Sequence, residues 1–110
     1  MIISEIIMTP DSEEDLIELS DYIAKILLAP QTAINYIREI KNGIKDLKHF
    51  PKRYKIIQDE PFYSLKIRRF IVNNFYIYYR IDEEKKIVYI LNVIYNKRNQ
   101  LRVLKDKFNE

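Results

Sequence analysis

The sequence predicts an α+β fold in which an antiparallel sheet carries a helical hairpin on one face. Residues 63–98 hold three runs rich in Ile, Val, Tyr and Phe, and these side chains favour extended chain. Two short polar turns, at 73–74 and 82–86, separate the runs, so the strands are expected to form an antiparallel meander. Residues 9–48 instead carry apolar side chains at helical spacing. The predicted order is β-α-α-β-β-β-α.

A short strand over 2–8 and a first helix open the chain. Thr9 is a suitable N-cap, Pro10 suits the first helical position, and acidic residues fill the first turn. An apolar stripe continues the helix to about residue 28: Leu16, Leu19, Ile23 and Ile26. The stripe is expected to face the sheet.

A second helix is predicted over 31–48, directly after Pro30. Its apolar stripe consists of Ala33, Ile37, Ile40, Ile44 and Leu47. Pro51 ends it, because proline disfavours helix in the residue before it, Phe50. The connection between the helices is very short, so they are expected to pack as an antiparallel hairpin.

Three strands, over 63–72, 75–82 and 87–95, and a short C-terminal helix over 99–108 complete the fold. Alternation along the second strand of this meander places Phe75, Ile77 and Tyr79 under the helices. Its other face then presents Tyr76, Tyr78 and Arg80 to solvent. If the preceding strand turns Leu65 and Ile67 inward, Lys66 and Arg68 join the open face, with Arg69 at an edge.

Composition limits the class of protein. The 110 residues predict a single domain, 1–110, with a formal charge of +3 and a pI of about 9.0. The absence of cysteine fits a reducing cytoplasm, where we expect the protein to act. No apolar run approaches the ~20 residues of a membrane span. The chain has no metal-binding motif or glycine-rich phosphate loop, so we expect no cofactor and interpret Asp82, Glu83 and Glu84 as a solvated turn.

The predicted open face interleaves cations with tyrosines. Cations bind phosphate and aromatic rings stack on unpaired bases, so this pattern indicates an RNA-binding surface. The expected substrate-binding residues are Lys66, Arg69, Tyr76, Tyr78, Arg80 and Lys97. The alternative is an ordinary solvated sheet face, where Lys, Arg and Tyr are common.

Over residues 3–104 the chain resembles the RelE/ParE superfamily, the toxins of type II toxin–antitoxin modules, often called plasmid-stabilisation proteins. The order and spacing of several segments carry the resemblance: Thr9-Pro10, Asp15-Leu16, 21–24, Pro30, 44–47, Phe50-Pro51, 66–69, 74–83 and 88–98. The resemblance implies a growth-arresting toxin held silent by a small antitoxin. RelE-like members cut messenger RNA on the ribosome, whereas ParE-like members poison DNA gyrase, and both share one fold.

We expect a RelE-like mRNA endonuclease, in which a ribose 2′-OH attacks the adjacent phosphate and gives a cyclic phosphate. The resemblance assigns the catalytic roles to Arg68, Tyr95 and Arg98. Arginine stabilises phosphate charge, while a tyrosine acting as acid or base needs activation because its ordinary pKa is about 10. His49 is interpreted as a helix-end residue and Glu60 as a solvated loop charge.

The chain also departs from the nuclease pattern. Well-studied nucleases of the family carry an arginine on the middle strand directly after an aromatic residue, and this chain has Tyr76 there. Two alternatives therefore stay open, a ParE-like gyrase inhibitor without nuclease activity and a degenerate member without toxicity. Under the toxin hypotheses we expect an acidic amphipathic segment of a cognate antitoxin to cover the apolar and basic surface of the sheet.

Overall fold

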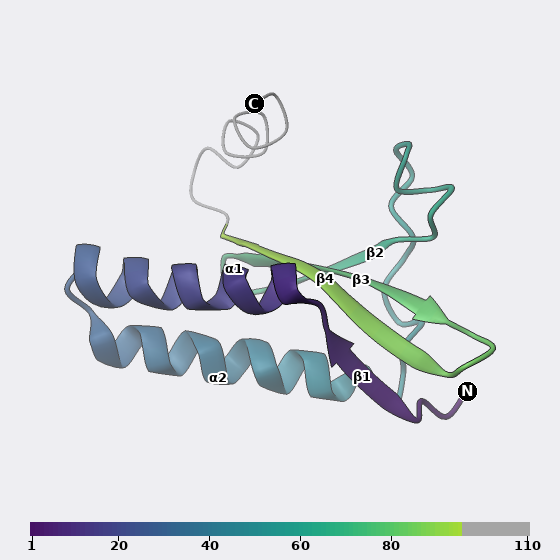
Figure 1. Ribbon diagram of the computed structural model, residues 1–110, viewed down its shortest axis with the longest axis horizontal. Coiled ribbons are helices and arrows are strands. Elements are labelled where there is room, and N and C mark those ends of the chain that lie inside the picture. Colours follow the sequence, from purple (N-terminus) through teal and green to yellow (C-terminus); the bar gives the residue numbers. More distant parts are fainter. Residues whose placement is uncertain (96–110) are drawn as a thin grey trace.

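The computed structural model describes residues 1–95, which form a four-stranded sheet and a helical hairpin (Figure 1). The sheet has the order β1-β4-β3-β2. The elements along the chain are β1 (Glu5–Met8), α1 (Pro10–Asp21), a π-helical segment η1 (Tyr22–Ile26), α2 (Pro30–Asp46), β2 (Arg68–Val72), β3 (Phe75–Asp82) and β4 (Ile87–Tyr95). The predicted element order and the α+β class are thus confirmed up to β4, and the predicted helix over 99–108 lies outside the described residues.

The first helix begins as the sequence predicts. The hydroxyl oxygen of Thr9 accepts a hydrogen bond from the backbone N–H of Ser12, and Pro10 occupies the first turn. The helical conformation reaches Ile26, but its last turn is the π-helical segment η1. After Leu28, which has a left-handed φ of 50°, the chain reverses into α2. The two helices lie side by side, as the short connection predicts (Figure 1).

The sheet is mixed, whereas a purely antiparallel sheet was expected. β3 pairs antiparallel with β2 and β4, but β1 pairs parallel with β4, from Glu5 opposite Ile87 to Met8 opposite Ile90. The helical hairpin separates β1 from the meander in sequence, so no tight turn constrains its direction. β1 therefore occupies the edge of β4 that β3 leaves free.

Beyond the end of β1, the start of helix α1 contacts the same edge of β4. The Thr9 hydroxyl donates to the carbonyl oxygens of Ile90 and Leu91, at 2.9 and 3.2 Å. Six residues later the Asp15 carboxylate accepts hydrogen bonds from the backbone N–H of Val93, at 2.9 Å, and from the side-chain amide of Asn92, at 3.2 Å. These contacts satisfy strand-edge groups that would otherwise be unpaired.

The main core lies between the sheet and the two helices. Phe75, Ile77 and Tyr79 are fully buried there, which confirms the predicted inward face of β3. Helix α2 approaches β2 very closely at Gly43, where an added Cβ would lie 3.0 Å from Val72 Cγ2 and 3.1 Å from Phe70 Cε2. A residue without a side chain at position 43 therefore permits this approach of helix to sheet.

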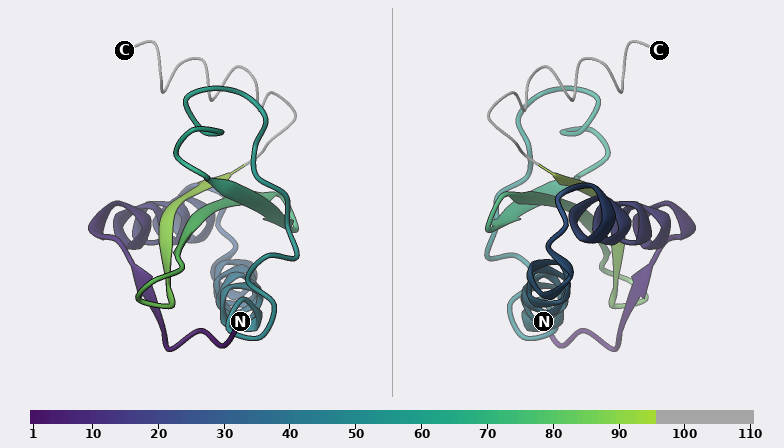
Figure 2. Two further views of the ribbon diagram at one scale, coloured as in Figure 1. Left: turned by 90° about the vertical axis from the view of Figure 1, so that its right-hand side faces the viewer. Right: turned by 90° about the vertical axis from the view of Figure 1, so that its left-hand side faces the viewer.

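The connection over 51–67 lies on the opposite side of the sheet from α2 along part of its course (Figure 2). Strand β2 begins at Arg68, five residues later than predicted, because Lys66 has a left-handed φ of 56° that interrupts the extended chain. Within the described residues no helix is long and apolar enough to cross a lipid bilayer.

Candidate functional site

The pairing register of β2 reverses the predicted placement of its arginines. Arg68 lies opposite Tyr79 and Phe70 lies opposite Ile77, so these residues share the helix-covered face. Arg69 lies opposite Tyr78 and belongs to the other face. The expectation that Arg68 stands on the open face with Arg69 at an edge is therefore wrong. The strand turns Phe70 inward, because that side chain fills space beside Tyr79.

The face expected to be open is partly covered by the connection over 51–67. A second buried cluster forms there from Ile67, Tyr78 and Ile94, with Ile57, Phe62, Tyr76 and Leu91 packed around it. The Phe62 ring stacks on Tyr78 with centroids 6.2 Å apart, and only 7% of Tyr78 is exposed. A buried ring offers no stacking surface, so the geometry does not support Tyr78 as a platform for an RNA base.

Two arginines on this side of the sheet remain exposed, and each lies over a tyrosine ring. The Arg69 guanidinium is 4.9 Å from the centroid of Tyr76, and that of Arg80 is 4.9 Å from the centroid of Tyr89. Such cation–π contacts hold the guanidinium groups against the sheet while leaving their polar edges accessible. Arg69 and Arg80 are therefore available to bind an anionic partner.

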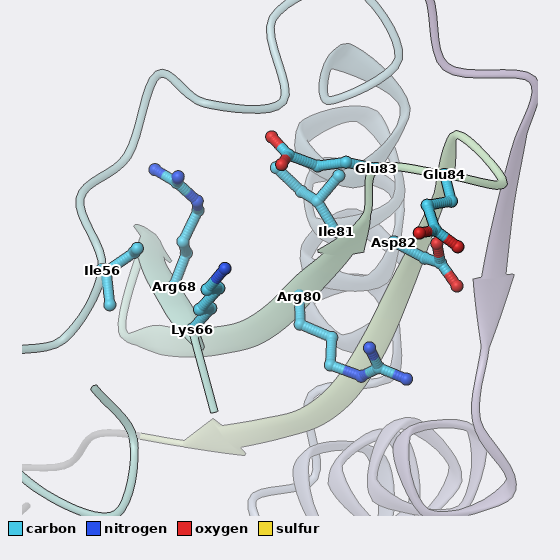
Figure 3. A pocket seen from close by; sticks show the side chains of 8 residues that line it. All are labelled: Ile56, Lys66, Arg68, Arg80, Ile81, Asp82, Glu83 and Glu84. Atoms are coloured by element: carbon cyan, nitrogen blue, oxygen red, sulfur yellow. The ribbon is translucent and has the colours of Figure 1, made fainter. Parts of the chain in front are cut away.

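An open pocket of about 480 Å³ lies where β3 extends beyond the start of β2 (Figure 3). Its lining combines the cations Lys66, Arg68 and Arg80 with the carboxylates of the β3–β4 turn, and the full set is Ile56, Lys66, Arg68, Arg80, Ile81, Asp82, Glu83 and Glu84. The Arg80 guanidinium points away from that of Arg68 (Figure 3). The pocket therefore brings basic and acidic groups together without a convergent cluster of cations.

Glu83 is already partnered at the rim of this pocket. Its carboxylate forms an ion pair with Lys52, which lies in the connection after α2. The Lys52 ammonium, through its hydrogen bond and its charge, holds the pKa of Glu83 below the ordinary value. Glu83 is thus a carboxylate at neutral pH rather than a general acid, and it reduces the positive potential that Lys66 and Arg68 create.

Arg68 has a structural partner that the sequence did not indicate. Its guanidinium donates a hydrogen bond to the carbonyl oxygen of Tyr54, at 2.6 Å. The neighbouring Tyr79 hydroxyl donates to the carbonyl oxygen of Pro51, also at 2.6 Å. Burial raises the pKa of Tyr79 to about 12, and the Arg68 charge only partly offsets this effect. Together the two side chains anchor the turn after α2 to the sheet.

Tyr95 lies far from Arg68, although both were predicted to be catalytic. Tyr95 pairs with Phe75 and its ring packs 5.0 Å from that ring, against the main core. Since Arg68 pairs with Tyr79, four residues of β3, about 13 Å, separate the two positions. The other predicted residues at this end, Lys97 and Arg98, lie outside the described part of the chain.

The remaining candidates have ordinary structural surroundings. His49 is exposed just after α2, and Glu60 accepts hydrogen bonds from the backbone and hydroxyl of Ser64. Among residues 1–95, no three carboxylates or histidines gather closely enough to hold a metal ion. The sequence predicts a polar connection with Lys52, Arg53 and Lys55 but no site there, although five lysines and arginines in the eleven residues 45–55 were a visible signal.

Comparisons with known proteins agree with this architecture. A sequence profile described as the ParE toxin of the type II toxin–antitoxin system parDE matches residues 6–100. A search of curated proteins finds no significant match.

Three solved structures resemble the fold at low sequence identity. The chromosomal ParDE toxin–antitoxin system of P. aeruginosa superposes with a TM-score of 0.69 at 17% identity, covering 87% of this chain and 98% of that one. The RelBE2 toxin–antitoxin complex of Mycobacterium tuberculosis gives 0.61 at 21% identity, covering 87% and 94%. The isolated E. coli RelE toxin gives 0.56 at 11% identity, covering 96% and 97%. Because the profile spans nearly the whole chain, this protein belongs to the ParE toxin family of type II toxin–antitoxin systems, within the RelE/ParE superfamily.

Proposed function

We propose that this type II toxin acts as a ParE-type inhibitor of DNA gyrase, through a protein–protein contact. The main support is the separation of the predicted catalytic residues. The Arg68 guanidinium is hydrogen-bonded to the backbone carbonyl of Tyr54. Tyr95 packs against the core, about 13 Å from Arg68 along the strand direction. A phosphate undergoing in-line attack needs its acid, base and charge-stabilising groups within hydrogen-bond reach. An inhibitor that binds a protein needs no such set.

The tip of the helical hairpin is the best candidate for that contact. Ile26, Leu27 and Leu28 are 67%, 45% and 82% exposed, and Ile34 at the start of α2 is 52% exposed. Figure 1 shows the tip at the end of the hairpin farthest from β1. An exposed apolar patch of this kind is typical of a surface that binds another protein. Leu28 keeps an apolar side chain although its left-handed backbone favours Gly or Asn.

A supercoiling assay with purified gyrase tests this proposal. We expect the toxin to inhibit supercoiling or to trap cleaved DNA, and Leu28→Asn to weaken that effect at least several-fold, because Asn tolerates the same backbone conformation but removes the apolar contact. Ile71→Thr, which changes an apolar residue on β2 that is 56% exposed and lies away from the tip, is the control. Normal supercoiling with no trapped cleavage complex, at toxin concentrations that arrest growth, would reject the gyrase target.

A RelE-like endonuclease is the second candidate, and the pocket lined by Lys66, Arg68 and Arg80 favours it. In that case these cations bind the RNA backbone and stabilise charge on the attacked phosphate. Mapping RNA 5′ ends after induction distinguishes the two functions. A nuclease gives new cleavage sites that Arg80→Ala suppresses, whereas intact messages during growth arrest rule it out. Normal growth on strong expression without antitoxin would instead indicate a degenerate, non-toxic member.

We also propose a small antitoxin as the cognate partner. Membership in a type II toxin family supports it, as do the toxin–antitoxin systems among the similar structures. The outer edge of β2 suits an acidic extended segment, because β2 is the last strand of the sheet and carries exposed Arg69 and Ile71. Purification of the native protein should recover a small acidic protein. Recovery without one would argue against this partner.

A further inference from the structure

A short, strongly basic segment spans the end of α2 and the turn after it, and we name it the basic turn, residues 45–55. It contains five cations, Lys45, Lys48, Lys52, Arg53 and Lys55, and one acid, Asp46. Its formal charge is therefore +4, five minus one, which exceeds the +3 of the whole 110-residue chain. All five cationic residues are exposed. A segment with this density of exposed positive charge attracts anions.

Helix stabilisation explains only part of this charge. Lys45 and Lys48 lie at the C-terminal end of α2, where cations interact favourably with the helix dipole. Lys52 forms the ion pair with Glu83. Arg53 and Lys55 lie beyond the helix and form no ion pair among residues 1–95, and the Arg53 guanidinium contacts the rings of Phe50 and Tyr54 through cation–π interactions. Their charge is available to a partner.

An exposed aromatic ring lies among these cations. Phe50 is 64% exposed, and the Arg53 guanidinium is 5.4 Å from its ring centroid. Beside the ring is a shallow depression of about 260 Å³, lined by His49, Phe50, Pro51, Lys52 and Arg53 together with Met1. A flat apolar surface bordered by cations matches a ligand that carries both a planar apolar group and negative charge.

The basic turn is held in place rather than being a loose loop. The hydroxyl of Tyr79 binds the carbonyl oxygen of Pro51, and the guanidinium of Arg68 binds that of Tyr54. The Tyr54 ring also stacks on Phe70, with centroids 4.8 Å apart. Because the backbone on both sides of Arg53 is anchored to the sheet, the surface loses little conformational entropy when it binds.

We propose that the basic turn binds single-stranded nucleic acid, with backbone phosphates on Lys48, Arg53 and Lys55 and an unpaired base against Phe50. Charge complementarity favours a polyanion, and the exposed ring favours one whose bases are free to stack. An acidic peptide would satisfy the cations but would leave the ring without a planar partner. This binding surface adjoins the pocket of Lys66, Arg68 and Arg80 but is lined by different residues, and it does not depend on which target the toxin arrests.

Fluorescence anisotropy with a labelled short oligothymidylate tests the proposal on the full chain. If about three phosphates are neutralised, the logarithm of the association constant should fall with the logarithm of salt concentration with a slope near −2.1, or about eighteen-fold between about 50 and 200 mM salt. Phe50→Ala should weaken binding about five-fold or more, while Phe50→Trp should preserve it. Arg53→Gln should weaken binding and reduce the steepness of the salt slope by about 0.7.

Lys25→Ala is the matched control, because Lys25 is an exposed cation near the other end of α2. It should leave the affinity unchanged, and thermal melting checks that each variant is folded. Equal loss with Lys25→Ala, or no effect of Phe50→Ala, would overturn the proposal. Displacement of the oligothymidylate by poly-glutamate at equal charge concentration would overturn it too, since it would identify an acidic-protein surface. A negative result in these tests does not bear on the gyrase proposal, because the basic turn and the hairpin tip are different surfaces.

Discussion

Removing one hydroxyl group should loosen the basic turn from the sheet. Tyr79 is fully buried, and its hydroxyl donates a 2.6 Å hydrogen bond to the carbonyl oxygen of Pro51. In Tyr79→Phe that carbonyl loses its partner while the ring still fills the core. An unsatisfied buried acceptor costs about 1–3 kcal/mol, and each kcal/mol lowers the melting temperature of a domain this size by roughly 4–8 °C. Urea and thermal unfolding at neutral pH measure the loss.

The pH dependence of the same variant gives a sharper test. The pKa of Tyr79 is raised from 10.0 to about 12 on folding, so the folded state keeps the phenol proton where the unfolded state releases it. The stabilisation is fully present below pH 10 and is lost as the pH rises towards 12. Two pKa units correspond to about 3 kcal/mol. The free energy of unfolding should therefore fall more steeply with pH in the wild type than in Tyr79→Phe.

Tyr63→Phe is the control, because Tyr63 is 52% exposed and its hydroxyl lies outside the core. The informative quantity is the difference between each variant and the wild type, because all other titratable groups are common to both. The control shows what loss of an exposed phenol does to that difference. A constant difference between Tyr79→Phe and the wild type, from about pH 9 to about pH 12, would refute the assignment of the raised pKa to the buried hydroxyl.

Three further substitutions test the packing around the site. Arg68→Ala should lower the free energy of unfolding, measured in urea, by about 1.5–3 kcal/mol, because the charged hydrogen bond to the Tyr54 carbonyl is lost. Arg69→Ala, which removes an exposed side chain, should lower it by less than about 1 kcal/mol. Equal effects of the two substitutions would contradict the anchoring role of Arg68. Asp15→Ala should accelerate amide hydrogen exchange at Val93, whose N–H it binds at 2.9 Å, and unchanged exchange would show that α1 does not protect this edge. Gly43→Ala should destabilise the protein although alanine favours helix by about 1 kcal/mol, because its Cβ would lie 3.0 Å from Val72. Asn42→Ala, on the exposed face of α2, should not destabilise it. A rise in melting temperature for Gly43→Ala would contradict the close approach of α2 to β2.

The fold was predictable because its signals are local. The cap at Thr9, the proline at position 10 and the two apolar stripes define the helices through hydrogen bonds and side chains a few residues apart. The bounds of β3 and β4 likewise follow from β-branched and aromatic runs ended by polar turns. The parallel pairing of β1 with β4 was missed, because nothing local records which edge a distant strand occupies.

The candidate site was less predictable because strand alternation gives two faces without saying which is buried. The need to place Arg69 at an edge was the available signal that Phe70 and Val72 were the better inward choice. Lys66 has a left-handed backbone just before β2, so the alternation of faces along β2 does not continue to the residues before Lys66. The same connection then folds Phe62 over Tyr78, a contact between distant parts of the chain.

The sequence by itself determined the α+β class, the order of the elements, the toxin family and the excess of positive charge, because each depends on composition or on short-range spacing. Only the tertiary structure decided that Arg68 anchors a turn, that Tyr78 is buried and that Tyr95 lies away from both. The physical reason is that a side chain's role depends on its neighbours in space. Those neighbours are set by strand register and by the path of the 51–67 connection, which the whole packed molecule fixes together.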